Sequence, residues 1–392
     1  MKKINIILAL LTISLMLAAC RKNGVEDINI NSCSNKNGFL NFSSDVAESP
    51  EGYYVLSKDL RNGNFLTYID KEKDKSTILC SKINCEHTFE KVPDDCDAYL
   101  GTVLQGSLNY YNGYIYYIAY NKDNYKCSLY KVSFDGSEHE KIFDLGTAPD
   151  MSNIYYSYVV TDSCVFYSAA IGVSGEKNAA KLNRYIFDNS KIETVYNYEG
   201  DKAEIFDLKM CKDKVFFRQS VGNERLKSEL YEWDIAGQRA NKIAEGICSY
   251  TLKAEEKLAY WKAFDGIYEI PMTAGNTAEN TAENIAGNEE KIFTCDEDTM
   301  LGFIASSNSD YYLYNMINTS YKKDTDIYIG NIKEGRIITK LYVNKEDYMM
   351  PLYVGSDKLI VDVYGKDGRY CGYSEIDNGQ LSDEIINMGI IR

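Results

Sequence analysis

The sequence is poor in residue types that several folds and reactions require. It contains 5 prolines, 2 tryptophans and 2 histidines among 392 residues, and its hydrophobic residues show almost no helical periodicity. The two histidines, His87 and His139, leave few candidates for a general base. Motifs for a nucleophile elbow, a zinc-protease helix, a phosphate-binding loop and a dinucleotide turn are missing as well. These absences weigh against the familiar hydrolase, zinc-protease and nucleotide-binding classes.

Positive charge is also scarce. The chain has 43 lysines and arginines against 58 aspartates and glutamates, a formal net charge of −15. A surface with this excess of negative charge repels polyanions. We therefore expect no binding to nucleic acid, whereas a protein, a peptide or a glycan remains open as a partner.

The first twenty residues have the pattern of a bacterial secretory signal. Two lysines precede an apolar run from Ile4 to Met16, which is too short to span a bilayer comfortably. The Leu-Ala-Ala-Cys sequence that ends at Cys20 resembles the lipobox of bacterial lipoproteins, in which the cysteine receives a diacylglycerol. We expect a signal peptide over residues 1–19 and lipidation of Cys20, which would anchor the protein on the extracytoplasmic face of the cell membrane. An ordinary cleaved signal is the alternative.

The remaining chain divides into a short tether and one long body. Residues 20–38 are polar, with many turn-forming residues and little periodicity, as expected for a flexible linker. Residues 39–392 contain no charge block or proline-rich stretch that would mark a domain boundary. We expect them to form a single domain.

A tyrosine-bearing segment recurs through this body. It returns about every 51 residues, which is the spacing of propeller blades rather than of helical repeats. The equivalent tyrosines are Tyr68, Tyr130, Tyr185, Tyr231, Tyr268, Tyr328 and Tyr373.

Hairpin signals lie between the aromatic runs. Asn112-Gly113 and Asp135-Gly136 separate alternating apolar segments, and such dipeptides favour the tight turns of antiparallel hairpins. The 34 tyrosines supply side chains that favour strands. The sequence therefore predicts an all-β protein, a β-propeller with seven four-stranded blades. Six or eight blades are the alternatives, and the segment Phe39–Phe42 is expected to pair either in the first blade or with the last.

The insertion after the first blade contains four potential metal ligands. Cys80, Cys85, His87 and Cys96 have the side chains of a tetrahedral Cys3His zinc site, although their spacing is not that of a standard zinc finger. Outside the cytoplasm two of these thiols could instead form a disulfide that closes the loop, and reduced thiols are the third alternative. The disulfide is the preferred interpretation, and metal analysis would decide between disulfide and metal.

The same segment resembles part of a known group of proteins. The sequence LCSKINCEHTFEKVPDDCDAYL, beginning at Leu79, resembles the cysteine loop of uncharacterised, lipid-anchored, TolB-like β-propeller lipoproteins of Firmicutes. The lipobox and the tyrosine-rich repeats extend the resemblance over most of the chain. It implies a propeller on a lipid anchor and no particular reaction.

Other candidate ligands are less patterned. Asp94-Asp95 and the pair Asp324 and Asp326 could bind calcium, but neither has the spacing of a known calcium loop, and we expect no cofactor beyond the possible zinc or calcium. The remaining cysteines are expected to be small buried packing residues: Cys33, Cys127, Cys164, Cys211, Cys248, Cys295 and Cys371.

These observations predict a binding or scaffold module at the cell surface rather than an enzyme. A propeller offers loops and a central face for recognition, and the sequence contains no convincing nucleophile or base, so we assign no catalytic residue. The alternative is a carbohydrate-active enzyme with a pair of carboxylates in the central funnel.

Overall fold

The computed structural model describes most of residues 41–391. The gaps are 60–62, 74, 86, 88–95, 149–153, 172–176, 202, 221–227, 254–256, 263, 273–288, 295–298, 304–310, 319–325, 332–335, 342–347, 356, 366–367, 378–379 and 383–384, and no side chain is described over 299–351. Contacts divide the chain into Met1–Asn31 and Ser32–Arg392, and all described residues belong to the second unit. The predicted signal peptide, Cys20 and the tether therefore lie outside the described residues.

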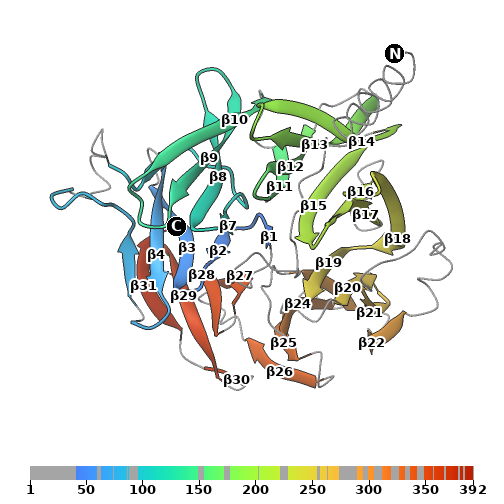
Figure 1. Ribbon diagram of the computed structural model, residues 1–392. Coiled ribbons are helices and arrows are strands. Elements are labelled where there is room, and N and C mark those ends of the chain that lie inside the picture. Colours follow the sequence, from blue (N-terminus) through green and yellow to red (C-terminus); the bar gives the residue numbers. More distant parts are fainter. Residues whose placement is uncertain are drawn as a thin grey trace, which may run out of the picture. The chain divides into compact units, whose positions relative to one another are not determined.

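The described residues form strands and no helix. Accordingly, none of their segments is a helix long and apolar enough to cross a membrane. The strands form seven antiparallel sheets, which follow one another around a common centre (Figure 1). The predicted all-β class is confirmed.

The first four sheets follow chain order from the N-terminal side. The first contains β2 (Val46–Glu48), β3 (Gly52–Asp59), β4 (Gly63–Asp70), β5 (Ser76–Ile78) and β6 (Tyr99–Gly101). The second contains β7 (Asn109–Tyr111), β8 (Tyr114–Asn121), β9 (Lys126–Ser133) and β10 (His139–Thr147). The third contains β11 (Ile154–Val160), β12 (Cys164–Ile171), β13 (Lys177–Ile186) and β14 (Lys191–Asp201). The fourth contains β15 (Glu204–Cys211), β16 (Lys214–Ser220), β17 (Ser228–Asp234) and β18 (Arg239–Ile247), joined by β1 (Asn41–Phe42).

Three further sheets complete the domain. The fifth contains β19 (Ser249–Lys253), β20 (Lys257–Lys262), β21 (Gly266–Pro271) and β22 (Glu290–Thr294). The sixth contains β23 (Thr299–Phe303), β24 (Tyr311–Asn318), β25 (Asp326–Asn331) and β26 (Arg336–Leu341). The seventh contains β27 (Tyr348–Val354), β28 (Lys358–Gly365), β29 (Gly368–Asp377), β30 (Gln380–Leu381) and β31 (Ile386–Ile391).

The repeated tyrosine occupies the same position in every sheet. All seven tyrosines lie on the third strand, that is, on β4, β9, β13, β17, β21, β25 and β29. In four sheets the ring contacts an aromatic ring directly opposite on the second strand, with centroids 5.2 Å apart for Tyr54 and Tyr68 and 5.6 Å apart for Tyr117 and Tyr130. Such cross-strand aromatic pairs stabilise an antiparallel sheet. The repeat is therefore a packing repeat.

The Asn-Gly turn has the geometry that its sequence predicts. Asn112 and Gly113 join β7 to β8 with φ angles of 49° and 82°, the left-handed region that a two-residue hairpin turn requires at both positions. At the turn between β9 and β10, Gly136 has φ 79°. A Cβ atom at Gly136 would lie 2.6 Å from the backbone oxygen of Leu79, so this turn of the second sheet packs tightly against the first sheet.

The N-terminal strand does not close the ring. β1 pairs with β15 of the fourth sheet, with Asn41 opposite Met210 and Phe42 opposite Lys209, and both expected pairings of Phe39–Phe42 are therefore wrong for its described part. The seventh sheet is instead completed by its own β30 and β31, both paired with β29.

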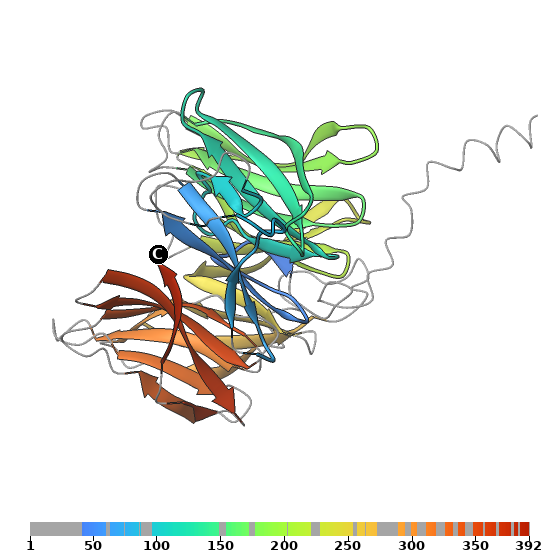
Figure 2. The ribbon, with the colours of Figure 1, turned by 90° about the vertical axis from the view of Figure 1, so that its left-hand side faces the viewer.

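Side chains connect the first and seventh sheets. Tyr353 donates a hydrogen bond to Glu48 at 3.0 Å, and Tyr53 donates one to Asp357 at 2.5 Å. Figure 2 shows the red C-terminal strands beside the blue strands of the first sheet. β1 itself lies near the centre of the ring of sheets (Figure 1).

Candidate functional site

The four predicted ligands come together in the first sheet. One ligand atom from each of Cys80, Cys85, His87 and Cys96 lies within 4.8 Å of all the others, and we call this group the Cys3His cluster. Cys96 is buried and the other three are partly buried. Phe65, Ala98 and Tyr99 pack around the thiols.

The thiols of the cluster have unequal proton affinities. Burial alone would raise the pKa of Cys80, but hydrogen bonds with His87 and with the backbone N–H groups of Lys82 and Asp97 lower it to about 7. Burial raises the pKa of Cys96 to about 12, and the neighbouring Cys85 adds to this rise. Such interactions favour negative charge on one sulfur at neutral pH and oppose it on another.

No disulfide joins any two of Cys80, Cys85 and Cys96, so the disulfide expected for this loop is not formed. Among the other described cysteines, Cys127, Cys164, Cys248 and Cys371 are buried as predicted and are in no disulfide. Cys211 is disulfide-bonded, so the expectation that it is only a packing residue is wrong. Cys33, Cys295 and the calcium candidates Asp94, Asp95 and Asp324 lie outside the described residues, as does the side chain of Asp326.

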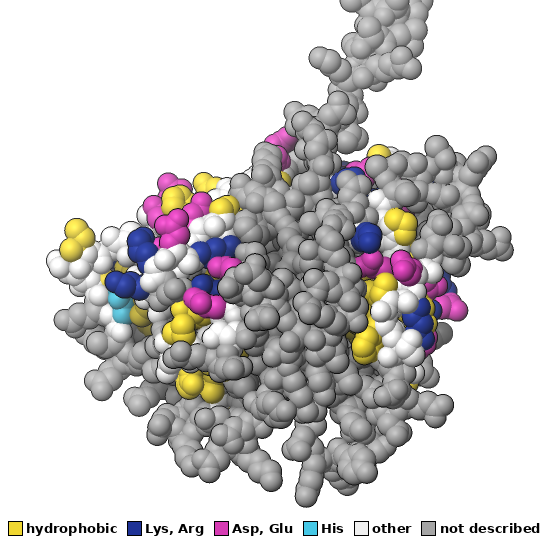
Figure 3. Space-filling model, turned by 90° about the horizontal axis from the view of Figure 1, so that it is seen from below, with side chains coloured by type: hydrophobic (Ala, Val, Ile, Leu, Met, Phe, Trp, Pro, Cys, Tyr) yellow, Lys and Arg dark blue, Asp and Glu magenta, His cyan; other side chains and the backbone are white. Residues whose placement is uncertain are grey.

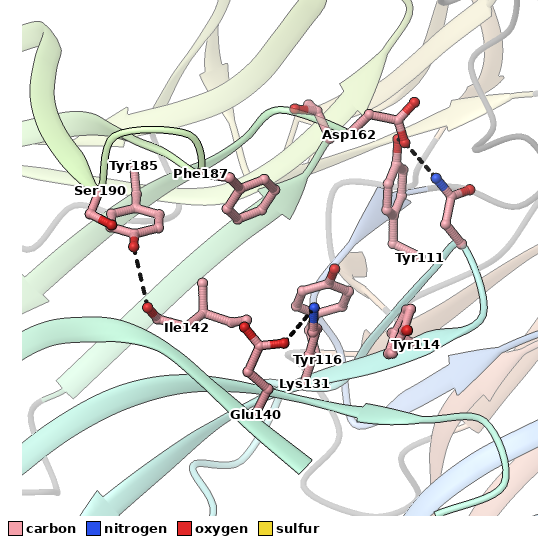
Figure 4. A pocket seen from close by; sticks show the side chains of 12 residues that line it. Tyr111, Tyr114, Tyr116, Lys131, Glu140, Ile142, Asp162, Tyr185, Phe187 and Ser190 are labelled. Carbon is pink, nitrogen blue, oxygen red and sulfur yellow. Dashed lines mark hydrogen bonds and ion pairs between the residues drawn. The ribbon is translucent and has the colours of Figure 1, made fainter. Parts of the chain in front are cut away.

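A cavity between the second and third sheets was not predicted. Its volume is about 510 Å³, and we call it the tyrosine cavity. Figure 4 shows Tyr185 and Phe187 on one side and Tyr111, Tyr114 and Tyr116 on the other. These rings come from strand ends and turns of two sheets. Only Tyr185 belongs to the repeat, so no sequence pattern marks the cavity.

Charged groups at the edge of the tyrosine cavity are already engaged. Lys131 Nζ lies 2.8 Å from Glu140 Oε2 and 4.8 Å from the centre of the Tyr114 ring. Asp162 Oδ1 accepts hydrogen bonds from Tyr111 at 3.1 Å and from Asn112 at 2.5 Å. The cavity thus combines aromatic walls with hydrogen-bonding groups at its edge, the composition typical of small-molecule sites.

The strand β15, next to β1, carries a buried charge. Lys209 is 2% exposed and its Nζ is paired with Asp207 Oδ1 and lies 4.1 Å from the centre of the Tyr250 ring. Asp207 has φ 58° at a bulge in β15, and Arg218 approaches its other oxygen at 3.8 Å. Among the described inner strands, the buried Glu48 of β2 is likewise paired with a cation, Lys71, at 2.9 Å.

The molecular surface mixes charges of both signs. In Figure 3 the acidic and basic side chains of the described residues lie next to one another on the face shown. The cross-strand pairs Arg184–Glu193 at 2.6 Å and Lys242–Glu229 at 2.7 Å are examples. Exposed pairs of this kind contribute little to stability.

Comparisons with known proteins identify the fold. No protein-family model matches the chain, and no curated protein does. Among solved structures, the β-propeller domain of the Trilobed protease from Pyrococcus furiosus matches with a TM-score of 0.52 and 11% identity, covering 89% of this chain and 95% of that one. This chain is a β-propeller. The Pyrococcus domain is described as having an open velcro topology.

Two peptidases contain a similar fold. Oligopeptidase B from Leishmania major matches with a TM-score of 0.51 and 9% identity over 88% of this chain and 49% of that one. A post-proline cleaving enzyme from Rickettsia typhi matches with a TM-score of 0.51 and 10% identity over 88% and 52%. The propeller therefore spans about half the length of each peptidase. Identities this low show the fold alone.

Proposed function

We propose that this protein is a lipid-anchored binding module on the extracytoplasmic face of the cell membrane, with each of its seven sheets serving as one blade. The tyrosine cavity is the observation that supports a binding role. It lies between two well-packed sheets whose strands hold its aromatic side chains in place, so little ordering is needed when a ligand enters.

We propose a neutral saccharide as the ligand of this cavity. Aromatic rings provide flat apolar faces on which a sugar ring can stack, and Asn112, Glu140 and Asp162 supply polar groups for its hydroxyls. An anionic ligand fits less well, because Lys131 is the cation among the lining residues and is paired with Glu140.

The carbohydrate-active enzyme is the weaker alternative. Glu140 and Asp162 come from different sheets and line one cavity, but a glycosidase requires one carboxyl group to be held protonated as general acid. Here Glu140 is paired with Lys131, and Asp162 Oδ1 accepts hydrogen bonds from Tyr111 and Asn112. These contacts support binding without cleavage.

Replacing an aromatic wall should weaken binding selectively. Phe187 lines the cavity and packs edge-on against Tyr185, with ring centres 6.1 Å apart. We expect Phe187→Ala to weaken the binding of a saccharide found on a glycan array about tenfold, because one stacking face worth about 1.4 kcal/mol is lost. Titration calorimetry measures the change.

Phe134 provides a matched control. It is 60% exposed on the turn after β9 and does not line the cavity, so Phe134→Ala should leave the affinity unchanged. Equal losses in both variants, or no saccharide bound at all, would contradict the proposed site. Cleavage of a bound glycan that stops in Glu140→Gln would favour the enzyme.

Membrane attachment is predicted to depend on Cys20. The variant Cys20→Ala lacks the thiol that accepts a diacylglycerol. We expect it to appear as an uncleaved precursor or in the medium, because the acyl chains that would hold the mature protein stably at the membrane are missing. Detergent phase partitioning and mass spectrometry of the N-terminus check this. Recovery of an acylated N-terminus from Cys20→Ala would contradict the lipobox assignment.

A further inference from the structure

The Cys3His cluster sits where the outer strand of the first sheet is interrupted. β5 pairs with β4 at Thr67–Ile69, and β6 pairs with β4 at Asn64 and Phe65. Between these two segments Leu66 accepts a hydrogen bond from Leu79 N–H at 2.9 Å and donates one to Ala98 O at 2.8 Å. The chain therefore leaves the sheet after Leu79 and returns at Ala98, opposite the same residue.

This geometry brings ligands from both ends of the insertion together. Cys80 is the first residue after the exit and Cys96 lies two residues before the return, whereas Cys85 and His87 belong to the insertion itself. Because the sheet fixes both ends, the two outer thiols are held close before any metal binds. Ligands that the sheet already holds close together lower the entropic cost of forming a metal site.

We propose that the Cys3His cluster binds one zinc ion and thereby fastens the insertion to the outer edge of the first sheet. In a tetrahedral site with Zn–S bonds of about 2.3 Å, neighbouring sulfur atoms are about 3.8 Å apart. The ligand atoms already lie within 4.8 Å of one another, so small rotations of the side chains suffice.

The chemistry of the four ligands favours zinc over the alternatives. Calcium and magnesium prefer oxygen ligands, whereas thiolates with one imidazole are typical of structural zinc sites. A disulfide would use only two of the three thiols. It would also leave the partly buried His87 without a role, although one of its ring nitrogens lies within 4.8 Å of the three sulfur atoms. One zinc ion engages all four side chains.

Residues around the cluster would support the bound metal. Backbone N–H groups of Lys82 and Asp97 donate hydrogen bonds to the sulfur of Cys80, and Lys82 Nζ lies 3.4 Å from Asp97 Oδ1. Ser81 donates a hydrogen bond to the other oxygen of Asp97. Such outer contacts orient thiolate ligands and offset their charge, and here they also join the two ends of the insertion.

Metal analysis of the purified full chain tests the proposal. Prepared without reductant or chelator, the protein should contain about one zinc per chain by plasma mass spectrometry, and Co²⁺ exchanged into it should give the visible absorption of a tetrahedral thiolate site. Cys96→Ser should reduce the zinc content at least tenfold. The matched variant Cys371→Ser, which removes a buried thiol of the seventh sheet that is in no disulfide, should retain the zinc.

Three results would overturn the proposal. These are less than about a tenth of a zinc per chain in the unmodified protein, iron in place of zinc, and a disulfide between any two of Cys80, Cys85 and Cys96 in peptides from protein that was never reduced. Because all three are measured on the unmodified chain, they stand even where Cys96→Ser fails to fold. None depends on the saccharide proposed for the tyrosine cavity.

Discussion

A chain that begins at Ser43 is expected to unfold at a much lower denaturant concentration than one that begins at Gly38. The shorter chain lacks β1, whose Asn41 is 4% exposed and whose Phe42 is 7% exposed. Asn41 Oδ1 accepts hydrogen bonds from Val160 N–H at 3.1 Å and from Asn109 Nδ2 at 2.9 Å, and its amide group donates to Val160 O. β1 therefore connects the second, third and fourth sheets.

The expected loss follows from these contacts. Three buried hydrogen bonds contribute about 1 kcal/mol each, and burial of the Phe42 ring, which stacks with Tyr353 at a centroid distance of 6.4 Å, contributes about 2 kcal/mol. We therefore expect the free energy of unfolding to fall by about 4 to 5 kcal/mol. Urea unfolding followed by tyrosine and tryptophan fluorescence measures it.

The single variant Asn41→Ala separates the hydrogen bonds from the ring. It should account for about half of the loss, because the partner groups on Val160 and Asn109 remain buried without Asn41. The chain that begins at Gly38 is the control, since it retains β1 and lacks only the predicted signal peptide and residues of the predicted tether. Unfolding of the Ser43 and Gly38 chains at the same urea concentration would show that β1 contributes nothing to stability.

Removing the negative charge of Asp207 is expected to destabilise the protein by about 3 kcal/mol. Lys209 is almost fully buried and paired with Asp207, and a buried charge that loses its partner is costly. Asp207→Asn is the suitable change because asparagine tolerates the left-handed φ of 58° at this position. Thermal and urea unfolding at constant pH measure the effect.

The free energy of unfolding that Asp207→Asn loses relative to the unmodified protein should depend on pH. Burial lowers the pKa of Lys209 in the folded protein, whereas Asp207 raises it, so the variant lowers this pKa further. In the unfolded chain the pKa of Lys209 is about 10.4. Below that pH the unfolded variant therefore binds more protons than the folded variant. Stability of the variant should therefore recover as the pH rises towards about 10 and decline as it falls.

A second change provides the matched control for this prediction. Lys209→Met removes the cation while keeping a side chain of similar length, so the double variant Asp207→Asn, Lys209→Met should recover most of the lost stability. The double variant should lack the pH-dependent loss of stability of Asp207→Asn between pH 7 and about 10, because the titrating group is gone. A double variant no more stable than Asp207→Asn would contradict the buried-charge explanation.

The sequence alone determined the features that depend on neighbouring residues. Hydrophobic alternation, the Asn112-Gly113 turn and the recurring tyrosine were sufficient to predict a propeller, and each repeat tyrosine lies on the third strand of a sheet. The reason is local: strand periodicity and turn geometry are set within a few residues. The composition of the insertion likewise gave all four members of the Cys3His cluster.

Only the tertiary structure decided which distant segments meet. β1 pairs with β15 rather than with the first or last sheet, and the rings of the tyrosine cavity come from strands and a turn of two sheets. The convergence of Cys80 and Cys96 depends on hydrogen bonds of Leu79 and Ala98 to one residue, Leu66. Such pairings are chosen by the packing of sheets and by the closure of long loops, which involve residues far apart in the chain and leave no periodic pattern in the sequence.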